Sequence, residues 1–143
     1  MTTLVLDASV AIKWAVPAAN EPLADESIRI FRRFRDSEID FLVPDIFWAE
    51  IGNVLWKGAK RQRWSSADAE MIASYFKDCD LQTVPSQLLL PEALKIAFTY
   101  DRNISDCLYV ALAAEAQLEL ITADERLANA MAARFPVKWL GAF

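Results

Sequence analysis

Short apolar runs alternate with stretches of helical periodicity along the chain, and this alternation constrains the fold more than any other feature. Apolar runs of this length, bounded by polar or proline breaks, are typical of strands buried on both faces of a parallel sheet. The expected strands are Thr3–Leu6, Phe41–Val43, Leu81–Val84, Leu118–Thr122 and, at an edge, Val137–Leu140. Parallel strands need right-handed helical crossovers. We therefore expect a three-layer α/β/α sandwich around a mostly parallel central sheet of four to five strands.

The segments between these runs predict helices. They are Ala8–Ala15, ended by Pro17; Leu23–Asp36; Ile46–Arg61; a helix started by Ser65 and ending near Cys79; Pro91–Tyr100, with Pro91 at the first helical position; Ser105–Ala114; and one after Glu125. Asp45 is expected to cap the helix that follows it, and Thr122 and Glu125 to form a capping box. With 143 residues and no repeat or low-complexity tract, the chain is expected to be a single domain, residues 1–143.

Composition excludes several kinds of chemistry. The chain has no histidine, which removes Ser-His-Asp and Cys-His nucleophilic systems and every zinc site that contains histidine. Its two cysteines do not form a C-x-x-C pair and are expected to be small buried residues. No apolar run reaches the roughly 18 residues of a membrane span, and no signal-peptide pattern is present, so we expect a cytoplasmic protein without a membrane partner.

The net charge is −5, but the basic residues are unevenly distributed. Two clusters stand out: Arg29, Arg32, Arg33 and Arg35, and Lys57, Lys60, Arg61 and Arg63. A uniformly acidic protein would repel nucleic acid. Each cluster is either a solvated helix face or part of a rim that contacts phosphates.

Acidic residues stand where a parallel sheet would gather them. Asp7 and Asp124 each follow an apolar strand, and Asp106 begins a helix. Glu50 lies about one turn inside a helix that follows a strand. Ligands of open α/β sheets bind outside the carboxyl ends of the strands. Taken alone, Asp7 fits a helix cap as well as a ligand; if it is a ligand, Ser9 takes the capping role.

Such a group of carboxylates would repel one another unless protonated or neutralised by a cation. Magnesium prefers oxygen ligands and is often held by one or two carboxylates together with substrate phosphates. It can also activate water without help from a histidine. The pattern therefore indicates hydrolysis of a phosphate ester.

Four segments together resemble a PIN-domain nuclease, in particular the VapC-type toxins of toxin–antitoxin pairs. They are Leu6–Ser9, Pro44–Leu55, Ser105–Ala113 and Ile121–Leu127. The resemblance implies a PIN-like fold and a magnesium- or manganese-dependent endoribonuclease that leaves a 5′ phosphate. Asp7 and Asp106 would be the principal metal ligands, and Glu50 and Asp124 would complete the catalytic acidic pocket.

The resemblance further implies that Ser9, Asn53 and Thr122 are polar groups supporting the ligands. It implies an RNA substrate, a homodimer, and an antitoxin protein that packs on the apolar helices and blocks the acidic pocket. The overall acidity departs from what RNA binding favours, and it makes the two basic clusters candidates for substrate contact.

Two other functions deserve comparison. A phosphatase with an aspartate nucleophile would need a D-x-D pattern, but Ser9 stands where the second acid would be. A catalytically degenerate PIN-like module could bind protein through Trp48 and Trp56. The retention of four carboxylates favours the nuclease over this module.

Overall fold

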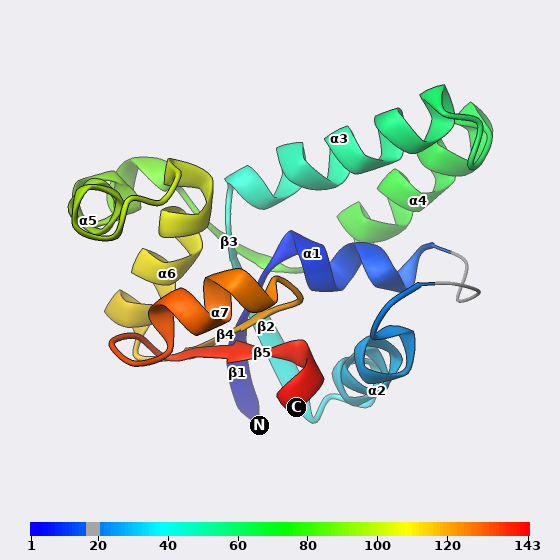
Figure 1. The fold of residues 1–143 in the computed structure, drawn as a ribbon. Helices are drawn as coiled ribbons and strands as arrows, with labels where there is room; N and C mark the ends of the chain where they lie inside the picture. Colours follow the sequence, from blue (N-terminus) through cyan, green and yellow to red (C-terminus); the bar gives the residue numbers. More distant parts are fainter. Residues whose placement is uncertain (17–20) are drawn as a thin grey trace.

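Five strands form one parallel sheet in the order β3-β2-β1-β4-β5 in the computed structural model, which describes residues 1–16 and 21–143 (Figure 1). The strands are β1 (Thr2–Leu6), β2 (Ile39–Pro44), β3 (Gln82–Val84), β4 (Glu119–Thr122) and β5 (Val137–Trp139). Each neighbouring pair is parallel, so all five predicted strands are confirmed and the sheet is wholly parallel. The strand order reverses between β1 and β4, which is where open α/β sheets place their sites.

The helices largely follow the sequence pattern. They are α1 (Ala8–Ala11), continued by the 3-10 turn η1 (Ile12–Trp14), α2 (Ala24–Arg35), α3 (Ile46–Lys60), α4 (Ser66–Asp78), α5 (Ser86–Tyr100), α6 (Ile104–Ala116), α7 (Glu125–Met131) and the 3-10 turn η2 (Leu140–Ala142). The predicted stop at Pro17 falls outside the described residues. Within those residues, no helix is long and apolar enough to cross a membrane.

Helix α6 forms the centre of the core. Its residues Cys107–Ala113 are all buried, and the helix packs against β1, β2 and β4. Helices α6 and α7 cover one face of the sheet and α2 covers the other, as right-handed crossovers require (Figure 1). The three-layer α/β/α arrangement predicted from the sequence is therefore confirmed. Cys107 is buried as expected, whereas Cys79 is only half-buried.

The predicted start of α5 at Pro91 is wrong. The helix begins five residues earlier, at Ser86, and Pro91 lies inside it. The Asp45 carboxylate accepts hydrogen bonds from the backbone N–H of Ser86 (2.9 Å) and from the Ser86 hydroxyl. Asp45 therefore caps α5 and not α3, where its side chain makes no capping bond. The Pro91 side chain is exposed, so the carbonyl group that it leaves without a helical partner can bind water.

Helices α3 and α4 extend away from the sheet as a hairpin at its carboxyl edge (Figure 1). Trp64 closes the hairpin, because its indole N–H donates to the Leu55 carbonyl (2.9 Å) and its ring covers Gly58. A Cβ atom at position 58 would lie 1.9 Å from the Trp64 ring, so the hairpin requires glycine there. Ser65 caps α4 by accepting from the Asp68 N–H (3.0 Å).

Candidate metal centre

Asp7 lies at the carboxyl end of β1, and its side chain is 9% exposed. The side chain makes no capping bond to α1. Its Oδ2 accepts hydrogen bonds from the hydroxyl groups of Ser9 (2.8 Å) and Thr122 (2.7 Å). Ser9 does not cap α1 either, because its Oγ accepts from the Ala123 N–H (3.0 Å). The two hydroxyl groups therefore fix the direction of the Asp7 carboxylate.

Thr122 connects Asp7 to Asp124. The Thr122 hydroxyl is buried; it donates to Asp7 and accepts from the Asp124 N–H (3.0 Å). The predicted capping box between Thr122 and Glu125 is wrong, because Asp124 itself caps α7. Its Oδ1 accepts from the N–H groups of Arg126 (3.0 Å) and Leu127 (3.2 Å). Asp124 is exposed, so its other oxygen remains open to a ligand.

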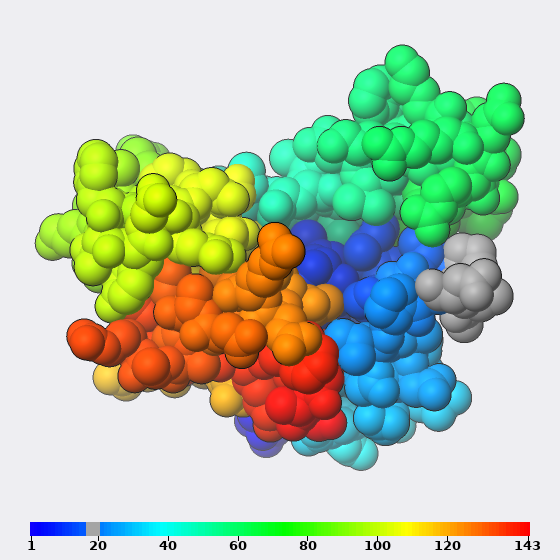
Figure 2. All heavy atoms as spheres, in the orientation of Figure 1, coloured from blue at the N-terminus to red at the C-terminus, as the bar shows by residue number. Residues whose placement is uncertain are grey.

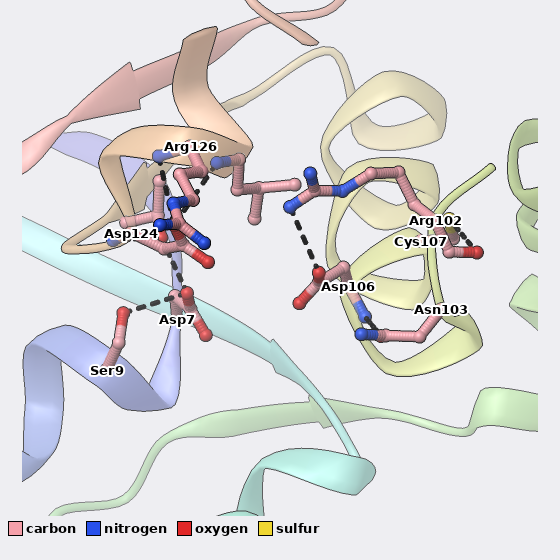
Figure 3. Close-up of polar contacts among 10 residues, drawn as sticks. Asp7, Ser9, Arg102, Asn103, Asp106, Cys107, Asp124 and Arg126 are labelled. Atoms are coloured by element: carbon pink, nitrogen blue, oxygen red, sulfur yellow. Dashed lines mark hydrogen bonds and ion pairs between the residues drawn. The ribbon is translucent and has the colours of Figure 1, made fainter. Parts of the chain in front are cut away.

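Asp106 reaches the same edge from the other side. Asn103 caps α6 by accepting from the Asp106 N–H (2.8 Å), which places Asp106 in the first turn, at the carboxyl edge of the sheet. Figure 3 shows Asp7, Asp124 and Asp106 around one space, with Asp106 on the wall opposite the other two. Its Oδ2 forms an ion pair with Arg102 (3.4 Å).

Glu50 approaches from α3 and is half-buried. Its Oε1 accepts a hydrogen bond from the hydroxyl of Tyr109 (2.7 Å). That hydroxyl also accepts from the Ala8 N–H (3.4 Å), beside Asp7. No role for Tyr109 was predicted from the sequence. A signal was present, since Tyr109 is three residues after Asp106 and so shares a helix face with it.

Burial raises the pKa of Asp7, Glu50 and Asp106. For Asp7, burial is the largest cause, hydrogen bonds from Thr122 and Ser9 oppose it, and the charge of Asp106 raises the pKa further. Burial also raises the pKa of Glu50, with contributions from Asp7 and Asp106. For Asp106, burial outweighs the opposing effect of Arg102, and the charge of Asp124 adds to the rise in pKa. The acids therefore lie within range of one another's charges.

The donor atoms fit a hard divalent cation, because they are carboxylate oxygens whose mutual repulsion a cation would relieve. As the side chains stand, no three acidic or thiol groups in the described parts of the chain are close enough to hold a metal ion together. A shared ion would therefore require these side chains to come closer together. Asn53 is exposed, lies one turn after Glu50 on α3 and makes no side-chain hydrogen bond among residues 1–16 and 21–143, so its supporting role stays a prediction.

The face that carries these acids is hollowed. Figure 2 shows the start of the α1 segment at the bottom of a depression, with α3 on one side and the α5–α6 region on the other. A polymer could reach the carboxylates there without entering a closed cavity.

Comparison with known proteins supports the same fold. PAE2754 from Pyrobaculum aerophilum is 19% identical with a TM-score of 0.73, over 99% of this chain and 85% of that chain. A toxin–antitoxin complex from Klebsiella pneumoniae is 17% identical with a TM-score of 0.60, over 94% of this chain and 95% of that chain. VapBC2 from Rickettsia felis, bound to a DNA fragment from its promoter, is 11% identical with a TM-score of 0.58, over 96% of this chain and 98% of that chain.

The search of curated proteins gives no match. The family model for the PIN domain, however, matches residues 4–132. This match spans β1 to α7 and contains every acid described above. The chain therefore belongs to the PIN domain family.

Proposed function

We propose that this protein is a divalent-metal-dependent endoribonuclease and the toxin of a toxin–antitoxin pair, with residues 1–143 acting as one domain. The PIN domain family is a family of nucleases. The observation that carries the proposal is the group of four acids from separate elements at one sheet edge: Asp7, Glu50, Asp106 and Asp124. In this group, two hydroxyl groups orient a nearly buried Asp7.

Asp7 and Asp106 would be the principal ligands of Mg²⁺ or Mn²⁺, and Glu50 and Asp124 would complete the pocket. When bound, the ion supplies a polarised phosphoryl oxygen and a water of lowered pKa. Ser9 and Thr122 hold Asp7 in place, and Tyr109 holds Glu50. Asn53, one turn after Glu50 on the exposed side of α3, would be a further supporting polar group.

Arg102 would exchange its partner when substrate binds. It pairs with Asp106 at 3.4 Å and is partly buried beside the acids. If Asp106 turns toward a cation, the guanidinium group becomes available to a substrate phosphate, which it can bind through two parallel hydrogen bonds. Arg102 would then supply a positive charge to the substrate phosphate.

The proposed partners are an RNA substrate, an antitoxin protein and a second copy of the chain. Support for the antitoxin comes from the structural neighbours, one of which is described as a toxin–antitoxin complex and another as VapBC2. The competing protein-binding module would use Trp48 and Trp56. Trp48 is half-buried and donates its indole N–H to Thr83 (3.1 Å), so it serves the fold and weakens this alternative.

Incubation of the purified protein with total RNA tests the proposal. We expect cleavage with Mg²⁺ or Mn²⁺, no cleavage in EDTA, and loss of cleavage in Asp7→Asn and Asp106→Asn. Glu119→Gln is a matched control, because Glu119 is exposed and lies at the beginning of β4, away from the acids. Cleavage that persists in EDTA or in Asp7→Asn would overturn the proposed mechanism.

A further inference from the structure

Beyond Glu50, the exposed side of α3 carries an aromatic and basic surface. Asn53, Trp56, Lys57 and Lys60 are all exposed and share one side of the helix through their three- and four-residue spacings. Arg61 follows at the end of the helix. We call Trp56, Lys57, Lys60 and Arg61 the α3 face. The side chain of Trp56 is 59% exposed, so much of its ring faces solvent.

The α3 face combines two features of single-stranded nucleic-acid sites. The Lys60 ammonium lies 5.0 Å from the centre of the Trp56 ring, so a cation stands beside an exposed aromatic surface. Lys57, Lys60 and Arg61 form no ion pair within the described residues, which leaves their charges available. Unpaired bases stack on aromatic side chains while basic groups neutralise the adjacent phosphates.

The surroundings of Trp56 favour one orientation for such a polymer. On its α4 side, Trp56 borders an apolar groove of about 280 Å³ whose opposite wall carries Glu70. A phosphate on that side would meet a carboxylate, whereas a phosphate on the other side would meet Lys57. A strand would therefore place its backbone along the lysine side.

The α3 face is continuous with the carboxylate site. Helix α3 contributes Glu50 to that site and packs mainly on α4 and α1, so it remains over the carboxyl edge of the sheet (Figure 1). At 1.5 Å per residue, Lys57 lies about 10 Å and Arg61 about 16 Å along the helix axis from Glu50. A strand of a few nucleotides spans this distance.

The basic cluster on α2 lies at the opposite edge of the sheet from the carboxylate site. Helix α2 ends just before β2 begins, so its last arginines stand at the amino edge of the sheet, opposite the acids. Arg33 pairs with Glu38 and Arg35 pairs with Asp36, so the net positive charge of this surface is reduced. Of the two clusters, only the one on α3 adjoins the site.

We propose that the α3 face binds a single-stranded stretch of the polymer whose phosphodiester lies at the carboxylate site, with Trp56 stacking on a base and Lys57 and Lys60 neutralising phosphates. The identification of this polymer as RNA rests on the proposed function. The α3 face thus provides an acidic protein with substrate affinity that the carboxylates themselves oppose.

Fluorescence anisotropy with a labelled single-stranded RNA of mixed sequence tests this proposal, in EDTA so that binding is measured apart from cleavage. We expect Lys57→Gln/Lys60→Gln to weaken binding and to reduce the slope of log Kd against log salt by about 0.7 per cation removed. The control Arg29→Gln/Arg32→Gln carries the same change in charge on two exposed α2 residues and is expected to bind like wild type. Equal losses in the two double variants would overturn the proposal.

Trp56 is tested separately. Trp56→Ala is expected to weaken binding by about tenfold and to remove most of the quenching of tryptophan fluorescence by RNA, whereas Trp56→Phe retains part of both. Duplex RNA of the same sequence is expected to bind more weakly. If Trp56→Ala binds RNA like wild type, Trp56 does not stack on a base and the proposal is wrong. Failure of the proposed function would instead appear as cleavage that survives Asp7→Asn, with binding in EDTA still dependent on the α3 face.

Discussion

The hydroxyl of Tyr109 donates a 2.7 Å hydrogen bond to Oε1 of Glu50 and so joins α6 to α3. The same hydroxyl accepts from the Ala8 N–H, which ties both helices to the end of β1. Burial raises the pKa of Tyr109 above its usual range, so the phenol stays protonated and remains a donor. One buried group therefore sets the position of a proposed ligand relative to the sheet.

Removal of this hydroxyl should cost both stability and activity. In Tyr109→Phe, we expect the free energy of unfolding to fall by about 1 kcal/mol, because Glu50 and the Ala8 amide both lose a partner. RNA cleavage should slow, because Glu50 is no longer held. Denaturant unfolding and initial cleavage rates measure the two effects. The control Tyr100→Phe, at a hydroxyl without a hydrogen-bond partner among the described residues, should change neither; equal losses in both variants would contradict the role of Tyr109.

Thr122 should control the pH at which Asp7 becomes charged. Its hydrogen bond lowers the pKa of Asp7, so Thr122→Val should raise that pKa further. Ionised Asp7 then forms only at higher pH, and the acid limb of the pH–rate profile should move upward. The measurement is the cleavage rate from mildly acidic to mildly alkaline pH. Thr99→Val serves as control, because the Thr99 hydroxyl bonds, within the described residues, only to the Lys95 carbonyl of its own helix. An unchanged acid limb in Thr122→Val would refute this assignment.

Asp45 should stabilise the start of α5. Hydrogen bonds from Ser86 hold the pKa of Asp45 below its usual value of 3.8. A lowered folded pKa means that the stabilisation is present above pH 3.8 and is lost as the pH falls through the folded pKa. Asp45→Asn should therefore lower the Tm at neutral pH, and the difference from wild type should shrink in acid. Thermal melts of both proteins from neutral to acidic pH test this prediction, with exposed Asp78→Asn as the control. A Tm difference between Asp45→Asn and wild type that does not change with pH would exclude a charge effect.

The sequence predicted the strands well because each is a short apolar run, and burial on both faces of a parallel sheet requires such runs. Helix α6 was equally clear from residues that are apolar around the whole circumference. The helix caps were predicted less well. Asp45, Ser9 and Thr122 have the right side chains for local caps, but none forms the predicted cap, and each bonds to an element distant in sequence. Tertiary contacts of this kind leave no local pattern.

The same limit applies to the candidate site. The positions of Asp7 and Asp124 followed from strand ends alone, because parallel strands share a carboxyl edge. The position of Asp106 depended on the α5–α6 crossover, which no local pattern specifies. Tyr109 resembled an ordinary core residue, and only the packing of α6 against α3 brings its hydroxyl to Glu50. Spacing on one helix predicts a shared face, but not which neighbour that face meets.

The raised pKa values of Asp7, Glu50 and Asp106 predict how pH and metal affect stability. Their ordinary values are 3.8, 4.5 and 3.8, and each is raised in the folded protein. The folded state then binds more protons than the unfolded state between the ordinary and raised values, so stability falls as pH rises through this window. In EDTA, the wild-type Tm should therefore increase as the pH falls through the raised pKa values toward the ordinary ones. Asp7→Asn should have a higher Tm than wild type at neutral pH, because it removes a buried charge.

With Mn²⁺ at neutral pH, the wild-type protein should have a higher Tm than Asp7→Asn. An ion that binds only the folded state stabilises it by about 2.7 kcal/mol at a concentration 100 times its Kd. The wild-type Tm should rise with Mn²⁺, and the rise should grow with pH because the ion competes with protons for the same carboxylates. Asp7→Asn and Asp106→Asn should respond weakly, and Glu119→Gln should respond like wild type. An equal Tm increase in Asp7→Asn and wild type would show that the ion binds elsewhere on the protein.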